Sequence, residues 1–284
     1  MRRRRFLGCL AALLSARSSL GASVPRRVLS VGGTVTEIVY ALDAQTQLVG
    51  TDQSSLYPPA AQKLPQVGYY RQLTLEGVLS LAPEVVLAAE GVGPPEVLEG
   101  LRAVGVEVHV FSAAAKVETL LENIRAIAAV LNESARGEAL ARKCRTQLDE
   151  LAANMPAESP EVLVLTTHTG QLRAAGRDTA ADAVLALAGG RNLLHARQSG
   201  YRIMGAESVA ALAPEWILTS PLSLRASGDS METFVATTGV ALTPAARQGR
   251  ILVLDDLLLL GFGPRLPTAI RTLREQFAAA RART

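Results

Sequence analysis

The segment that decides the fold of this 284-residue chain is its middle, Lys116 to Asn154, with the sequence KVETLLENIRAIAAVLNESARGEALARKCRTQLDELAAN. It contains no proline and a single glycine, Gly137, and its apolar residues recur three and four positions apart. That spacing places the apolar side chains along one face of an α-helix. An uninterrupted helix of this length would span about 55 Å, more than one compact lobe needs. We therefore expect it to bridge two lobes, with Gly137 as a candidate dent or break.

Short apolar strands alternate with helical patterns on both sides of this segment, which is typical of parallel α/β sheets. The predicted strands are 28–31, 85–88 and 106–111 before it, and 162–165, 216–219 and 251–254 after it. The predicted flanking helices are 34–42, 94–104 and 267–280. The sequence therefore predicts an α/β protein with a strand-rich half on each side of the long helix.

The two halves share an internal repeat. Residues 76–87 (EGVLSLAPEVVL) and 207–218 (ESVAALAPEWIL) are identical at seven of twelve positions. Each copy has the pattern of a short helix stopped by proline and followed by a buried strand. Such joints occur in many α/β proteins, but this degree of identity, once in each half, favours two similarly built lobes. We predict an N-terminal lobe at 23–115, a linking helix at 116–155 and a C-terminal lobe at 156–284, each lobe Rossmann-like with a central parallel sheet, and a ligand cleft between them.

The first 22 residues have the pattern of an export signal. Arg2 to Arg5 form a cationic region, Phe6 to Leu14 an apolar region, and Leu20 to Ser23 a small-residue exit. We expect cleavage after Ala22 or Ser23. A membrane anchor is the alternative, but the apolar stretch is too short to favour it. The consecutive arginines followed by Phe6 also resemble a twin-arginine signal, so the export route stays open.

Composition excludes several functional classes. The chain is 49% hydrophobic, which excludes a disordered protein, and no apolar run after residue 23 is long enough to span a bilayer. The formal charge is +3, and it becomes −2 when the five arginines of residues 1–22 are removed, so a nucleic-acid footprint is not indicated. Cys9 leaves with the leader, and the remaining Cys144 alone cannot form an internal disulfide.

Common catalytic motifs are missing from the sequence. It has no Gly-x-Ser-x-Gly elbow, no Walker A loop and no His-Glu-x-x-His. Residues 91–94 (GVGP) lack the spacing of a dinucleotide fingerprint, and His109, His168 and His195 share no metal-ligand spacing. The sequence thus favours a binding protein. An exported enzyme that works in the cleft without a recognisable motif is the alternative.

The segment with the most informative chemistry is 65–73, PQVGYYRQL. Pro65 and Gly68 indicate an irregular loop, in which two tyrosines stand side by side before Arg71. A phenol ordinarily loses its proton near pH 10, but a neighbouring guanidinium or ferric iron favours the phenolate, and tyrosine is an axial ligand of haem iron. Arg71 also suits a carboxylate such as a haem propionate. From the residues alone, simple packing of both tyrosines against their lobe is the favoured interpretation.

From Arg27 to about Arg265 the chain resembles the periplasmic haem-binding proteins of bacterial ABC haem importers. They form part of the helical-backbone, class III family of substrate-binding proteins, together with cobalamin and siderophore binders. The resemblance is carried by residues 31–42 (VGGTVTEIVYAL), 67–73 (VGYYRQL) and 260–265 (LGFGPR). It implies that Tyr69, directly after Gly68, binds the haem iron, and that the protein works in the periplasm.

The same resemblance implies a function and partners. The chain would capture ferric haem as a transported ligand, with no catalytic cofactor, and deliver it to the permease of an ABC transporter for haem and iron uptake. Glu76 and Glu207, at matching positions of the repeat, would meet basic residues of that permease. Each is also an ordinary first-turn acid favoured by the helix dipole. We expect a monomer that changes shape little on binding. Cobalamin or a ferric siderophore is the alternative ligand for the same scaffold.

Five further residues are candidates for the ligand site. His168 follows a predicted strand, in a loop expected at the cleft, and some relatives hold a second haem through a histidine near this position. Tyr201 and Arg202 precede the second copy of the repeat as Tyr69, Tyr70 and Arg71 precede the first. Arg265 is a candidate partner for a propionate. Tyr70 would either stack beside the porphyrin or point away.

Overall fold

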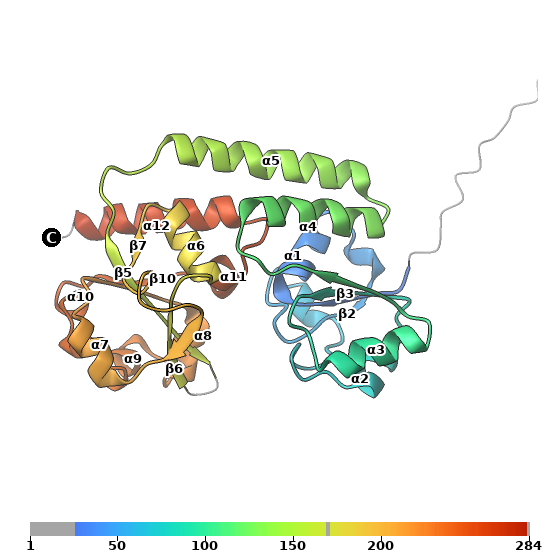
Figure 1. Ribbon diagram of the computed structural model, residues 1–284, viewed down its shortest axis with the longest axis horizontal. Helices are drawn as coiled ribbons and strands as arrows, with labels where there is room; N and C mark the ends of the chain where they lie inside the picture. The colour runs from blue at the N-terminus through green and yellow to red at the C-terminus, as the bar shows by residue number, and fades with distance from the viewer. Residues whose placement is uncertain (1–25, 169–170, 283–284) are drawn as a thin grey trace, which may run out of the picture.

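The computed structural model describes residues 26–168 and 171–282, and Figure 1 shows two α/β lobes lying side by side beneath long helices. The predicted export signal lies outside the described residues. In the N-terminal lobe, four parallel strands stand in the order β2-β1-β3-β4. They are β1 (Val28–Val31), β2 (Leu48–Gly50), β3 (Val85–Ala89) and β4 (Glu107–Phe111). The helices of this lobe are α1 (Gly33–Ala41), α2 (Leu75–Leu79) and α3 (Pro95–Ala103), with 3₁₀ turns at Gln45–Gln47 and Ala61–Lys63.

The C-terminal lobe is built on a mixed sheet, ordered β10-β9-β5-β6-β8, with β7 paired to the start of β5. The strands are β5 (Glu161–His168), β6 (Gln171–Ala175), β7 (Arg191–Asn192), β8 (Tyr201–Ile203), β9 (Trp216–Thr219) and β10 (Ile251–Val253). The α/β fold with a central parallel sheet is confirmed: β10, β9, β5 and β7 pair in parallel, while β6 runs antiparallel to both β5 and β8. The helices are α6 (Ala180–Leu187), α7 (Ala206–Leu212), α8 (Pro221–Ala226), α9 (Met231–Thr237), α10 (Pro244–Arg247), α11 (Asp256–Leu260) and α12 (Leu266–Arg281), with a 3₁₀ turn at Val240–Leu242.

The segment between the lobes is two helices, which corrects the single helix predicted over 116–155. α4 (Val117–Val130) packs on α1 of the N-terminal lobe, and α5 (Ser134–Ala153) turns back over α4 and reaches α12 of the C-terminal lobe. The chain reverses at Asn132, whose φ of 61° is left-handed. Asparagine tolerates this conformation, and the N–H of Glu133 closes the turn on the carbonyl of Ala128 at 2.7 Å. Helical periodicity continues through such a turn, so the sequence pattern did not reveal it.

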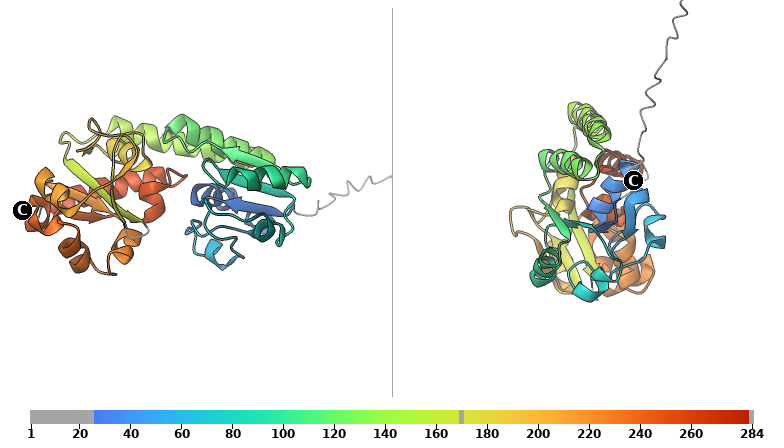
Figure 2. Two further views of the ribbon diagram at one scale, coloured as in Figure 1. Left: turned by 60° about the horizontal axis from the view of Figure 1, so that its bottom comes forward. Right: turned by 90° about the vertical axis from the view of Figure 1, so that its right-hand side faces the viewer.

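Gly137 marks a close approach of the two helices and not the break. A Cβ at this position would lie 2.4 Å from the Cβ of Ala128 on α4. A larger side chain here would push α5 away from α4. The glycine therefore allows the helical hairpin to pack tightly, and α5 alone spans the two lobes (Figure 2).

The internal repeat forms the same joint in both lobes. α2 and α7 each end shortly before an alanine with left-handed φ, Ala82 at 43° and Ala213 at 45°. Each alanine precedes a proline, which disfavours a continued right-handed helix, and each proline leads into a central strand, β3 or β9. The helix–proline–strand prediction is confirmed for both copies.

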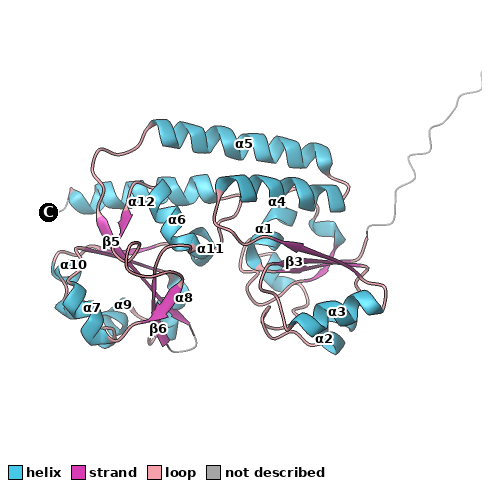
Figure 3. Cartoon of the chain, viewed as in Figure 1, coloured by secondary structure: helices cyan, strands magenta, loops and turns pink. Residues whose placement is uncertain are grey.

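One hydrophobic cluster is shared by both lobes. It joins Val39 and Leu87 of the N-terminal lobe to Ile124 of α4, Leu148 of α5 and Leu273 of α12. Each lobe has a second cluster on the opposite face of its sheet, so each is a three-layer α/β unit with helices on both faces (Figure 3). The exact lobe bounds stay a prediction, although the two sheets fall on either side of residues 116–155. Among the described residues, none of the helices combines the length and apolar character that crossing a membrane requires.

Arg274 on α12 ties the ends of two other helices together. Its Nη1 donates to the carbonyls of Leu151 and Asn154 at the end of α5, both at 3.0 Å. Its Nη2 donates to Leu187 at 3.1 Å and its Nε to Ala188 at 3.3 Å, at the end of α6. The last carbonyls of a helix have no partner within the helix, so one guanidinium satisfies the termini of both.

We expect Arg274→Ala to lower the free energy of unfolding by about 2 kcal/mol or more, because it leaves several carbonyls without a charged donor. Urea denaturation followed by circular dichroism measures this change. Arg271→Ala on the same helix is the control, since its exposed side chain reaches only Thr268, at 3.5 Å. Equal stability of the two variants would show that the hydrogen bonds of Arg274 to the ends of α5 and α6 do not stabilise the fold.

Candidate functional site

The loop that carries Tyr69 is held against the end of β2. The N–H of Val67 donates to Thr51 and the carbonyl of Gly68 accepts from Gln53, both at 2.9 Å. Gly68 has a φ of 93°, a conformation that favours glycine, and no atom lies within 4 Å of where its Cβ would be. Backbone strain and not crowding therefore accounts for the glycine before Tyr69.

Buried Asp52 anchors the same region. Its Oδ1 accepts from the N–H of Gly32 at 2.8 Å, and its Oδ2 accepts from the N–H of Ser54 at 2.8 Å. The carboxylate therefore joins the start of α1 to the segment that pairs with Gly68. Asp52 was not singled out from the sequence, because an isolated aspartate after a short strand carries no pattern of its own.

Tyr69 and Tyr70 pack edge to face. Their ring centroids are 4.8 Å apart at an interplanar angle of 70°, and both side chains are half-buried. The Cζ of Arg71 lies 5.1 Å from the centroid of Tyr70. Tyr70 thus stands between Tyr69 and Arg71, and it also packs against the cluster on the outer face of the N-terminal sheet. These contacts give Tyr70 a role in orienting Tyr69.

The protonation of Tyr69 differs from the expectation that Arg71 favours its phenolate. Burial raises the pKa of Tyr69 above 10, and the neighbouring Tyr70 raises it further. Arg71 lowers this pKa, but by less than burial raises it. The physical reason is that Arg71 is exposed and its guanidinium is directed to the ring of Tyr70. In the ligand-free protein Tyr69 is therefore a neutral phenol.

Tyr201 of the C-terminal lobe stands at the start of β8 and is partly buried. Burial raises the pKa of Tyr201 to about 12, and Tyr70 contributes to this shift across the two lobes. Hydrogen bonding to Thr179 and to the backbone N–H of Ala181, at the start of α6, opposes the shift. Arg202, next on β8, is exposed.

Arg265 forms several contacts within the protein, and its role as a partner for a propionate stays a prediction. Its Nη2 lies 2.9 Å from Oε2 of Glu37 and 3.4 Å from Oδ1 of Asp255. Its Cζ lies 3.5 Å from the centroid of Tyr57. Glu37 and Tyr57 belong to the N-terminal lobe, so Arg265 is already committed to a contact between lobes. Neither Glu37 nor Tyr57 was identified from the sequence as a partner of Arg265. The sequence feature that could have indicated Glu37 is its position as an acid on the apolar face of α1.

His168 lies at the end of β5, opposite Gln171 in the β5–β6 hairpin. The loop predicted at this position is corrected, because the strand continues beyond Leu165 to His168. Glu76 and Glu207 are exposed in the first turns of α2 and α7, as the repeat predicted.

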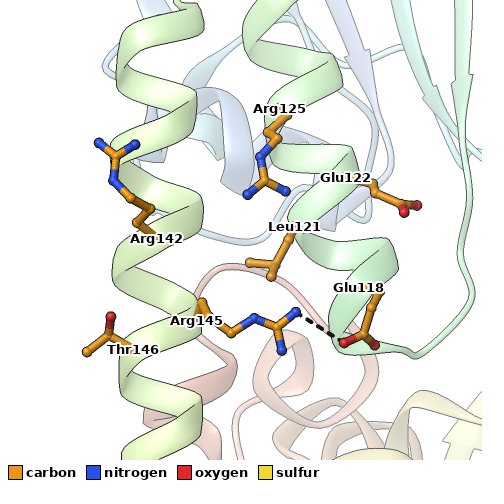
Figure 4. Close-up of a pocket in the computed structure, with 7 residues that line it drawn as sticks. All are labelled: Glu118, Leu121, Glu122, Arg125, Arg142, Arg145 and Thr146. Carbon is orange, nitrogen blue, oxygen red and sulfur yellow. Dashed lines mark hydrogen bonds and ion pairs between the residues drawn. The ribbon is translucent and has the colours of Figure 1, made fainter.

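Two grooves of the described structure lie away from these residues. One, of about 310 Å³, runs between α4 and α5, where Arg125, Leu121 and Arg145 lie between the helices and Arg145 pairs with Glu118 at 3.1 Å (Figure 4). The other, of about 420 Å³, lies beside Trp216 in the C-terminal lobe. Neither is lined by Tyr69, Tyr70 or Tyr201. The ligand cleft between the lobes therefore stays a prediction.

Comparison with known proteins places the chain in a family. Residues 28–258 match the periplasmic binding protein family. The structure is similar to periplasmic heme-binding protein RhuT from Roseiflexus sp. RS-1 in apo form, with a TM-score of 0.84 and 36% identity over 90% of this chain and 99% of that one. It is also similar to a periplasmic heme binding protein from Pseudomonas aeruginosa, with a TM-score of 0.81 and 39% identity over 89% and 93% of the chains.

A third relative is named for a different ligand. The vitamin B12-binding protein of Vibrio vulnificus (strain CMCP6) is 27% identical over 92% of this chain and 93% of its own. All three relatives are named as binding proteins and none as an enzyme, which agrees with the absence of catalytic motifs. This chain belongs to the periplasmic binding protein family, and it is a two-lobed substrate-binding protein.

Proposed function

We propose that this protein captures ferric haem in the periplasm and delivers it to an ABC permease. The observation that carries the proposal is the position of Tyr69, which is half-buried on the N-terminal lobe and packed edge to face against Tyr70. A porphyrin supplies four nitrogen ligands to its iron, so one phenolate oxygen completes an axial bond. The two heme-binding relatives, at 36% and 39% identity, support this ligand.

Arg71 and Arg202 would pair with the haem propionates. Both guanidinium groups are exposed, and within the described part of the chain neither forms an ion pair with a carboxylate. Arg71 stands beside the tyrosine loop, and Arg202 follows Tyr201 on β8. A planar guanidinium matches a carboxylate through two parallel hydrogen bonds. Arg265 is not assigned this role, because Glu37 and Asp255 already occupy its Nη2.

His168 would be the ligand of a second haem. Its place at the end of β5, in the lobe opposite Tyr69, supports a coordination point separate from the first iron. Titration to saturation counts the haems that each chain binds, and a second equivalent that is lost in His168→Ala would assign this role.

Tyr69→Phe should weaken hemin binding by about 30-fold or more, the loss expected for a central contact worth about 2 kcal/mol. The phenolate–iron charge-transfer absorbance should disappear as well, since Phe has no oxygen. Tyr40→Phe, on α1 and away from the loop, is the matched control and should bind as wild type does. An unchanged spectrum in Tyr69→Phe would contradict the ligand assignment.

Cobalamin is the second candidate ligand, favoured by the relative from Vibrio vulnificus. Competition of cyanocobalamin against bound hemin, read from the hemin spectrum, separates the two. Displacement at equimolar cobalamin would contradict the haem assignment.

The contribution of Tyr69 to the hemin affinity should increase with rising pH. The ligating form is the phenolate, so binding releases the phenolic proton, and burial keeps that proton in place in the free protein. The ratio of the affinities of wild type and Tyr69→Phe should therefore rise by about tenfold per pH unit below the pKa of Tyr69. Spectroscopic titrations measure this ratio at pH values low enough that the iron of hemin carries water and not hydroxide, because an iron-bound hydroxide would take up the released proton. A flat ratio would argue against phenolate coordination.

Charge reversal of both repeat glutamates should impair delivery and leave capture intact. Glu76→Arg with Glu207→Arg should reduce hemin uptake by a reconstituted permease about tenfold, because unlike charges at a docking rim become like charges. Hemin binding in solution should not change. Glu99→Arg with Glu232→Arg alters two other exposed acids by the same total charge and serves as the control. An equal loss of uptake in this control would reject specific docking.

A further inference from the structure

Beyond the shared hydrophobic cluster, the lobes meet at a polar junction formed by α1 on one side and the α11–α12 corner on the other. Glu37 on α1 has a side chain only 4% exposed, and it accepts from the Nη2 of Arg265 at 2.9 Å. Its other oxygen accepts from the backbone N–H of Arg265 at 3.1 Å. Thr34, one turn earlier on α1, donates to the carbonyl of Gly261 at 2.6 Å. These bonds join residues more than 200 positions apart in the sequence.

Two glycines allow the elements of this junction to approach. A Cβ at Gly33 would lie 2.7 Å from Cδ2 of Leu257 on α11 and 2.4 Å from the carbonyl oxygen of Ser54. A Cβ at Gly263 would lie 3.1 Å from Oε1 of Glu37. The junction therefore has one close-packed arrangement, and sliding of one lobe past the other would break it.

The junction extends to the loop of Tyr69 through Tyr57. The guanidinium of Arg265 lies over the ring of Tyr57 at 3.5 Å, a cation–π contact between the lobes. Tyr57 follows the segment in which Asp52 is bonded to Gly32 and the N–H of Gln53 is bonded to the carbonyl of Gly68, the residue before Tyr69. Arg265 is thus linked to the loop of the predicted iron ligand by its contact with Tyr57, by the backbone of residues 53–57 and by the hydrogen bond between Gln53 and Gly68.

We propose that Arg265 is a positioning residue, which holds the C-terminal lobe against the Tyr57–Tyr69 loop through Glu37 and Tyr57 and thereby slows release of the bound ligand. The part that concerns release rests on the proposed function, whereas the part that concerns lobe position does not. Arg265 itself does not touch the ligand. Lysine cannot replace it fully, because an ammonium lacks the planar face that covers the ring of Tyr57.

The test uses variants that spare the buried charge of Glu37, since removing all of Arg265 would leave that carboxylate without its cation. Tyr57→Leu removes the ring at a residue 38% exposed, and Tyr57→Phe, which keeps the ring, is its matched control. Arg265→Lys is the second variant. Spin labels at Glu99→Cys on α3 and Ser208→Cys on α7 report the distance between the lobes in the ligand-free protein. The native Cys144 is only 2% exposed, so the labelling reagent should not reach it.

We expect a broader distance distribution in Tyr57→Leu and Arg265→Lys, and hemin dissociation faster by about threefold to tenfold with the Tyr69–iron spectrum retained. Tyr57→Phe should match wild type in both measurements. Unchanged distances in both variants, or broader distances with unchanged dissociation, would overturn the proposal. If wild-type protein fails to bind hemin, the proposed function is wrong and the distances alone decide whether Arg265 positions the lobes.

Discussion

The arrangement of the whole molecule depends on the packing of α5 across both lobes. Its first turns lie on α4, where Gly137 permits close contact, and it continues to α12 of the other lobe. The buried side chains beneath these helices form one cluster that includes both sheets. Packed interiors resist gradual deformation, so a lobe cannot rotate freely about such a support. This physical constraint favours a receptor that binds with small movements, as the sequence analysis expected.

A neutral phenol at position 69 has consequences for selectivity. A phenolate formed before binding would attract any cation that reached it, whereas a half-buried, protonated tyrosine binds a weak Lewis acid only weakly. Ferric iron can displace the proton, because the bond to the phenolate oxygen compensates for ionisation in a partly buried position. In the proposed haem complex, Arg71 would help to stabilise this phenolate, since it already lowers the pKa of Tyr69 in the free protein. In this view the metal of the ligand, and not a pre-existing charge, generates the anionic ligand.

Several features were readable from local sequence because they depend on neighbours along the chain. The helix–proline–strand joints of the repeat were predicted, and the structure shows left-handed Ala82 and Ala213 in both. The turn at Asn132 was missed, because apolar periodicity is the same on both sides of a single left-handed residue. The β5–β6 hairpin was missed for a related reason: a strand extended to His168 and its antiparallel partner need long-range pairing that no local pattern specifies.

By itself, the sequence determined the α/β class, the two related halves, the helical segment between them and the tyrosine loop, since periodicity, proline placement and a short motif are properties of adjacent residues. Tertiary structure alone decided what Arg265 does. Nothing near position 265 shows that Glu37 and Tyr57, more than 200 residues earlier, lie against its guanidinium. It also decided the protonation of Tyr69, because the degree of burial, and not the presence of Arg71 two positions away, sets the larger effect on that pKa. Burial and ion pairing depend on which distant surfaces meet, and only the folded chain specifies those.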